Sequence, residues 1–180
     1  MITYGVVLAA GAGSRFGGPK APFVYQGERL VDRAVANLKA GGCDEVMVVL
    51  GAWVGEIPDA DEIYVNSSWD EGLATSVKMA IEQLIASPAD RCCLTLVDLP
   101  GLTPAAIAKV LAANSELAQA TFRDEPTHPV LLSRTHWLPL LQSLEGDVGA
   151  RNYLIEQGDN VAKIAIDDVA QGDDLDFQPT

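Results

Sequence analysis

A glycine-rich loop near the start of the chain has the residues best suited to chemistry. It follows the apolar run at residues 5–10, and it contains four glycines and two cations: Gly11, Gly13, Gly17, Gly18, Arg15 and Lys20. A buried strand that ends in small residues lets backbone N–H groups surround an anion. Two cations beside those N–H groups suit a polyphosphate. The loop therefore predicts nucleotide chemistry, whereas a plain strand-to-helix turn would leave both cations in solvent.

Two well-known glycine loops do not fit this spacing. A P-loop places Ser or Thr directly after its Lys to hold Mg²⁺, but Ala21 follows Lys20. A dinucleotide-binding loop has the spacing Gly-x-Gly-x-x-Gly and an acid at the tip of the second strand. The stretch from Gly13 to Gly17 is one residue too long, and the expected second strand runs into Gly51-Ala52-Trp53 without an acid.

Asp98 is the strongest candidate for binding a metal. It follows the apolar run 92–97 and precedes Leu99-Pro100. A carboxylate at the end of a buried strand suits Mg²⁺, which takes one or two carboxylates together with phosphate oxygens. A helix-capping or turn Asp is the alternative, and the nearby glycine loop favours the metal.

Strands and helices alternate along the sequence. Buried strands are expected at 5–10, 46–50, 63–65, 92–97, 130–132 and 161–166, and helices at 30–38, 73–85, 103–113, 137–144 and 152–157. This order predicts an α/β fold with a mostly parallel, Rossmann-like sheet between two helical layers. Ligands then gather at the carboxyl ends of the strands. We expect one domain over residues 1–180, with a loose acidic tail at 170–180.

Composition favours a cytoplasmic enzyme. Apolar residues make up 48% of the chain, without a run long enough to span a membrane and without a basic leader. Cys43, Cys92 and Cys93 lack metal-ligand spacing and are expected to be reduced core thiols. A net charge of −13 argues against binding to nucleic acid polymers, but Mg²⁺ and local cations still permit a mononucleotide.

The segment from Leu8 to Lys20 resembles the loop of nucleotidyltransferases that make sugar nucleotides and cofactors, Leu-Ala-Ala-Gly-x-Gly-x-Arg-x-Gly-x-x-Lys. The resemblance implies a nucleotide-diphospho-sugar transferase fold, with Arg15, Lys20 and Asp98 as catalytic residues. Asn66, Trp69, Gly72 and Ser76 match a family loop that closes over the nucleotide base, although Thr75 and Ser76 would also suit helix capping. The implied nucleotide-binding residues are Leu8, Ala9, Ala10, Gly11, Ala12, Gly13, Ser14, Arg15, Lys20, Asn66, Gly72, Thr75 and Ser76.

Two later motifs narrow the resemblance to the molybdenum-cofactor cytidylyltransferases and the related molybdopterin guanylyltransferases. Residues 125–132 are similar to a Gly-His-Pro-Val-Leu segment, and residues 146–151 match Gly-Asp-x-Gly-Ala-Arg. The acceptor there is molybdopterin, and the implied acceptor-binding residues are His128, Pro129, Gly149 and Arg151. The implied donor is an NTP, CTP before GTP, and the implied protein partner is a molybdoenzyme or its maturation factor.

The end of the chain departs from the family pattern Asp-x-Asp-Thr-Pro-Glu-Asp-Leu. Residues 168–175 read Asp-Val-Ala-Gln-Gly-Asp-Asp-Leu, with Ala170 in place of the second Asp. Asp168, or Asp167 as its substitute, is expected to join Asp98 at the Mg²⁺.

The predicted reaction is nucleotidyl transfer, in which the acceptor's phosphate attacks the NTP in line and pyrophosphate leaves. Substitutions such as Ala74, Thr127 and Ala170 keep open a pyridine-nucleotide-linked reductase or a cofactor-handling protein. A transferase acting on a sugar phosphate is a third reading.

Overall fold

The computed structural model describes residues 1–179. Its centre is a seven-stranded sheet. Thr180, the last residue of the expected domain and tail, lies outside the described residues. The sheet order is β5-β4-β1-β6-β8-β7-β9, which confirms the α/β fold with a mostly parallel sheet. Its strands are β1 (Thr3–Ala9), β4 (Glu45–Leu50), β5 (Glu62–Val65), β6 (Arg91–Leu96), β7 (Leu117–Phe122), β8 (Glu125–Ser133) and β9 (Val161–Ala165).

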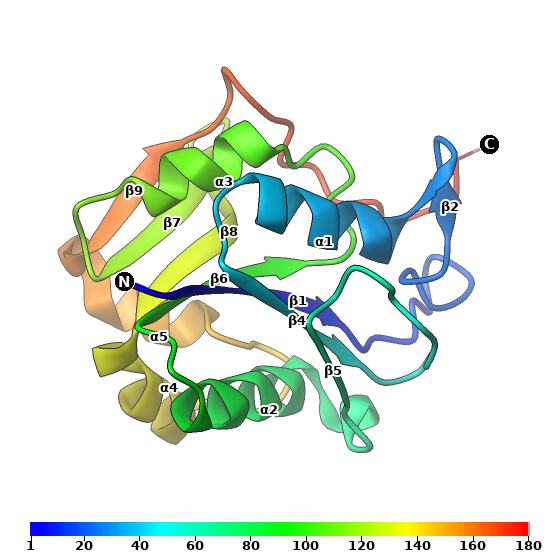
Figure 1. The fold of residues 1–180 in the computed structure, drawn as a ribbon, viewed down its shortest axis with the longest axis horizontal. Coiled ribbons are helices and arrows are strands. Elements are labelled where there is room, and N and C mark those ends of the chain that lie inside the picture. The colour runs from blue at the N-terminus through cyan, green and yellow to red at the C-terminus, as the bar shows by residue number, and fades with distance from the viewer. Residues whose placement is uncertain (180) are drawn as a thin grey trace.

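Helices cover both faces of the sheet (Figure 1). One face packs against α1 (Leu30–Ala40) and α3 (Pro104–Leu111), and the other against α2 (Leu73–Ala86), α4 (Trp137–Ser143) and α5 (Arg151–Gln157). Strand β1 contributes to both layers because its alternate side chains are all apolar: Val7 and Ala9 face α1, while Val6 and Leu8 face α2. The central strands are thus fixed by burial on two sides.

Short elements complete the connections. A small hairpin pairs β2 (Val24–Tyr25) with β3 (Glu28–Arg29), and single 3₁₀ turns lie at Trp69–Glu71, Arg134–His136 and Gly158–Asn160. Helix α3 begins as the sequence predicts, because the hydroxyl of Thr103 accepts the N–H of Ala106 and Pro104 occupies the first turn.

The sheet differs from the prediction at β7 and β8. Strand β7 was not predicted, and the strand expected at 130–132 is the final part of the longer β8. Strand β8 runs antiparallel to both β6 and β7. The amino end of β8 therefore lies beside the carboxyl end of β6, which brings the β7–β8 hairpin next to Asp98.

The acidic tail lies against the body of the protein, at least as far as Asp176. The N–H of Gln171 donates to the carbonyl of Gly101 (3.1 Å), and the N–H of Leu175 donates to the carbonyl of Asp98 (2.8 Å). This path returns the chain to the end of β6.

Candidate functional site

The glycine loop leaves β1 and folds back on itself. The carbonyl of Gly13 accepts the N–H groups of Gly17 (2.9 Å) and Gly18 (3.1 Å). Gly13 has φ +60°, and a Cβ there would lie 2.0 Å from the carbonyl oxygen of Gly18, so only glycine fits this turn. The turn brings Lys20 back toward the carboxyl ends of β1 and β6.

Four charged side chains meet at this point. The ammonium of Lys20 is 2.8 Å from Asp98 Oδ2 and 4.0 Å from Asp176 Oδ1, and the guanidinium of Arg15 is 3.1 Å from the same Asp176 oxygen. Lys20 and Asp98 are mostly buried, with 14% and 18% of their side chains exposed, whereas 74% of Arg15 is exposed. Lys20 is therefore held by its buried contact with Asp98, while Arg15 lies at the exposed edge and pairs with Asp176.

One carboxylate oxygen of Asp98 has no hydrogen-bond partner. Its Oδ2 accepts from Lys20, but its Oδ1 is buried without a hydrogen-bond partner. A buried carboxylate oxygen without a donor is costly, and a divalent cation would satisfy it. Residues 1–179 contain no cluster of three or more His, Cys, Asp or Glu side chains that would hold a metal alone. The site thus fits a cation that phosphate oxygens also ligate.

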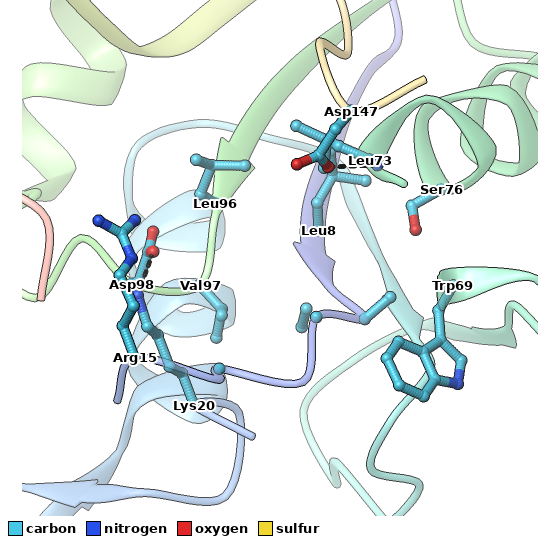
Figure 2. Close-up of a pocket in the computed structure, with 14 residues that line it drawn as sticks. Leu8, Arg15, Lys20, Trp69, Leu73, Ser76, Leu96, Val97, Asp98 and Asp147 are labelled. Atoms are coloured by element: carbon cyan, nitrogen blue, oxygen red, sulfur yellow. Dashed lines mark hydrogen bonds and ion pairs between the residues drawn. The ribbon is translucent and has the colours of Figure 1, made fainter. Parts of the chain in front are cut away.

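These residues line a cavity of about 420 Å³ at the carboxyl ends of β1 and β6. Figure 2 shows Arg15, Lys20 and Asp98 on one side of it and Trp69 and Ser76 on the other. Nine of the predicted site residues border this cavity, which is named the nucleotide cavity after the sequence prediction: Leu8, Ala9, Ala10, Gly11, Gly13, Arg15, Lys20, Ser76 and Asp98. Trp69, Leu73, Leu96, Val97 and Asp147 border it as well.

Residues 66–76, the predicted base-binding segment, include side chains with two different roles. Asn66 is 3% exposed and donates to the hydroxyls of Thr75 (2.8 Å) and Ser76 (3.0 Å). Thr75 in turn donates to backbone carbonyls of Ser68 and Gly72. Asn66 and Thr75 therefore brace the segment, whereas Ser76 reaches the cavity. Gly72, Ala12 and Ser14 do not border the nucleotide cavity, although Ser14 lines a shallower hollow beside Asp176.

The structure does not bring Asp167 or Asp168 to Asp98, which corrects the expected metal pair. Asp168 pairs with Lys109 on α3 (2.7 Å) and Asp167 accepts the N–H of Arg123 (2.7 Å). The chain turns at Ile166, whose carbonyl accepts the N–H groups of Val169 and Ala170, so both carboxylates point away before the tail reaches β6.

The carboxylate of the last segment that comes within 4.0 Å of Lys20 is that of Asp176. Asp174-Leu175-Asp176 has the same Asp-x-Asp spacing that was sought at residues 168–170. Matching the motif to this later pair would have found Asp176 in the sequence.

A second cavity of about 290 Å³ adjoins the first, and Leu8, Leu73 and Leu96 border both. His128 and Arg151 line this second cavity, as predicted for acceptor-binding residues, along with mostly apolar side chains. The Nδ1–H of His128 donates to the carbonyl of Leu94 (3.2 Å). Burial lowers the pKa of His128 below its usual 6.5, although the Leu94 carbonyl opposes this. A neutral ring with a proton on Nδ1 leaves Nε2 as an acceptor.

Pro129 and Gly149, which were also predicted to bind the acceptor, do not border this cavity. Pro129 is buried within β8. Gly149 has φ +55°, and a Cβ there would lie 2.9 Å from the side chain of Leu73. Pro129 follows His128 on β8, and Gly149 lies two residues before Arg151 and packs against α2.

The cysteines do not supply a nucleophile to either cavity. All three thiols are buried and free. Burial raises the pKa of Cys92 to about 12, and a hydrogen bond with Cys43, together with burial, raises the pKa of Cys93. Thiolates are the reactive form, so chemistry at this site relies on other groups.

Residues 5–161 match the MobA-like NTP transferase domain, and the chain belongs to this family. It is 32% identical, over 96% of its length and 91% of the relative's, to nicotine blue oxidoreductase of Paenarthrobacter nicotinovorans. The structure of Rv0371c from Mycobacterium tuberculosis is similar, with a TM-score of 0.79, 27% identity and coverage of 98% and 94% of the two chains. Rv0371c has also been crystallised with manganese. The fold is shared with a nucleotidyl transferase of Methanothermobacter at a TM-score of 0.76, 19% identity and coverage of 91% and 87%.

A search of residues 1–179 found no helix that is both long enough and apolar enough to cross a membrane.

Proposed function

We propose that this protein transfers a nucleoside monophosphate from an NTP, CTP before GTP, to a phosphorylated acceptor, molybdopterin first, and releases pyrophosphate. The observation that carries the proposal is the pair of adjoining cavities. One holds the glycine loop with Lys20 and Asp98, and the other holds His128 and Arg151. Two substrates in neighbouring cavities are what a direct transfer between them requires.

The phosphates of the donor bind at the charged end of the nucleotide cavity. Backbone N–H groups at Gly11 to Ser14 donate to phosphate oxygens, as they do in other glycine loops. Lys20, held by Asp98, and the exposed Arg15 stabilise the charge that develops on the α-phosphate and the leaving pyrophosphate. The base lies toward Trp69 and Ser76 at the opposite end.

Asp98 and Asp176 are the residues that would hold Mg²⁺. Both carboxylates approach Lys20, and Asp98 Oδ1 has no protein partner. Mg²⁺ when bound supplies positive charge to the phosphates. The manganese complex of the similar Rv0371c supports a divalent cation in this family.

The acceptor binds in the second cavity. Arg151 meets its phosphate, and Nε2 of the neutral His128 accepts a hydrogen bond from its ring system. The acceptor's phosphate then attacks across the leucines that both cavities share. A molybdoenzyme or its maturation factor would receive the product, and reduced thiols suit a cytoplasmic setting.

Pyrophosphate release tests this function. The purified protein is incubated with Mg²⁺ and CTP or GTP, with and without molybdopterin. We expect release that needs both the nucleotide and the acceptor, with CTP the faster donor. Absence of release with every donor would reject the transferase assignment.

The second candidate function is reduction of a conjugated ring compound by NADPH. The similarity to nicotine blue oxidoreductase supports it, and so does the mostly apolar lining of the second cavity beside a neutral His128. Oxidation of NADPH in the presence of nicotine blue, without Mg²⁺, is the matching assay. NADPH binding without CTP binding would favour this candidate.

A further inference from the structure

The loop at residues 146–151 bonds directly to the start of helix α2. The N–H of Leu73 donates to Asp147 Oδ1 (3.0 Å), and the N–H of Ala74 donates to the carbonyl of Gly146 (3.1 Å). Figure 2 shows the first of these bonds at the edge of the nucleotide cavity. The residue preceding the helix is Gly72, which has no side chain to cap it. A loop distant in sequence therefore caps α2, and its carboxylate also suits the positive end of the helix.

Two glycines allow the loop and the helix to approach this closely. A Cβ at Gly72, where φ is +117°, would lie 2.5 Å from the carbonyl oxygen of Gly146. A Cβ at Gly149 would press on Leu73 at 2.9 Å. The first of these contacts is between backbones, which cannot move aside as a flexible side chain can. The contact is therefore tight on both sides of the Asp147 bond.

This contact joins the two cavities. Leu73 borders both of them. On one side, the braced segment that ends in α2 carries Trp69 and Ser76 into the nucleotide cavity. On the other side, the loop carries Val148, Ala150 and Arg151 into the second cavity. The hydrogen bonds at Leu73 and Ala74 therefore connect movements of residues 66–76 to movements of residues 146–151.

We propose that Asp147 is a positioning residue that couples the two substrate cavities, so that a nucleotide bound against the 66–76 segment orders the 146–151 loop and sets Arg151 for the acceptor. The proposal rests on the proposed function for the identity of the two ligands. Asp147 acts through the N–H of Leu73 and through Arg151, without touching the reacting atoms. Ordering by one ligand then lowers the cost of binding the other.

Hydrogen–deuterium exchange of the full chain, free and with CTP and Mg²⁺, tests the coupling. In the wild type, CTP should slow exchange in residues 66–76 and also in residues 146–151. In Asp147→Ala, the free protein should exchange about tenfold faster in both segments, as expected for loss of one hydrogen bond that caps a helix, and CTP should no longer protect 146–151. Asp147→Asn keeps an acceptor oxygen and should restore the protection.

Two further variants separate this role from a general loss of stability. Gly72→Ala forces the loop away from the helix by another route and should behave as Asp147→Ala. Glu145→Ala removes the same charge from a neighbouring exposed residue and should behave as the wild type. CTP protection of 146–151 that survives in Asp147→Ala would overturn the proposal. If CTP does not bind at all, the donor assignment fails, and the coupling is then judged from the free protein. Faster exchange in free Asp147→Ala that is confined to residues 146–151 would overturn the coupling.

Discussion

The two cavities share a wall of three leucines but differ in what lines them. The nucleotide cavity is bordered by a backbone loop and by Lys20 and Asp98, which pair with each other, and by Arg15, which pairs with Asp176 outside the cavity lining. The second cavity is bordered by more apolar than polar side chains, and its polar lining includes Glu125, a neutral His128 and Arg151. The difference suggests that the first handles phosphate charge while the second selects by shape. Variants that affect one cavity and spare the other test this division.

Asp98→Asn should have the largest effect, and on the nucleotide side only. The change removes the charge that a divalent cation needs and weakens the hold on Lys20, so we expect turnover to fall about 100-fold or more. Pyrophosphate release and an Mg²⁺ titration measure the loss, with the melting temperature as the control for folding. An unaltered Mg²⁺ requirement would place the cation elsewhere.

Asp176→Asn comes next, with Asp168→Asn as its matched control. Both variants remove one acidic charge from the last segment of the chain, but only Asp176 reaches Lys20 and Arg15. We expect turnover to fall roughly 10-fold in Asp176→Asn and to stay unchanged in Asp168→Asn. A larger loss of turnover in Asp168→Asn than in Asp176→Asn would assign the metal to Asp168.

Arg151→Ala should affect the second cavity alone. Calorimetry should give a Kd for CTP within about twofold of the wild type, while acceptor-dependent turnover falls about 10-fold because one charged contact to the acceptor is lost. Loss of CTP binding in a folded Arg151→Ala protein would show that the two cavities are not divided in this way.

The smallest expected effect is on stability and comes from His128. Its pKa is lowered in the fold by burial, so below about pH 6.5 the unfolded chain binds more protons than the native one. Stability contributed by the neutral ring is present above that pH and is lost as the pH falls. Thermal melts from pH 7.5 to 5.5 should decline more steeply for the wild type than for His128→Asn. Equal slopes would assign the acid sensitivity to other groups.

More of the residues that border the first cavity could be predicted from the sequence, because they lie close together along the chain. The loop from Leu8 to Lys20 and the end of β6 each carry their chemistry in consecutive residues. Strand β7 escaped prediction because Leu-Ala-Gln-Ala-Thr-Phe has neither a long apolar run nor clean alternation, and it forms a strand through pairing with β8 and β9.

Other features depend on tertiary contacts that a pattern does not encode. Asp147 lies in the Gly-Asp-x-Gly-Ala-Arg motif, but that motif does not reveal the bond from Asp147 to Leu73, which spans 74 residues of sequence. Asp176 reaches Lys20 only because the tail bonds to Asp98. The division of Asn66 and Ser76 into bracing and cavity-facing roles follows from burial, which the motif alone does not distinguish.

The bond between Leu175 and Asp98, with Asp176 beside Arg15, has a consequence for how the protein unfolds. It joins segments from near both ends of the described chain at a single place. A ligand bound at this place contacts the last segment, the first strand and the middle of the sheet. Local unfolding of any one of them would release the ligand, so the ligand opposes local unfolding in all three. Nucleotide should therefore protect the whole chain from proteolysis as one cooperative unit, and early cleavage sites scattered across the sequence should disappear together.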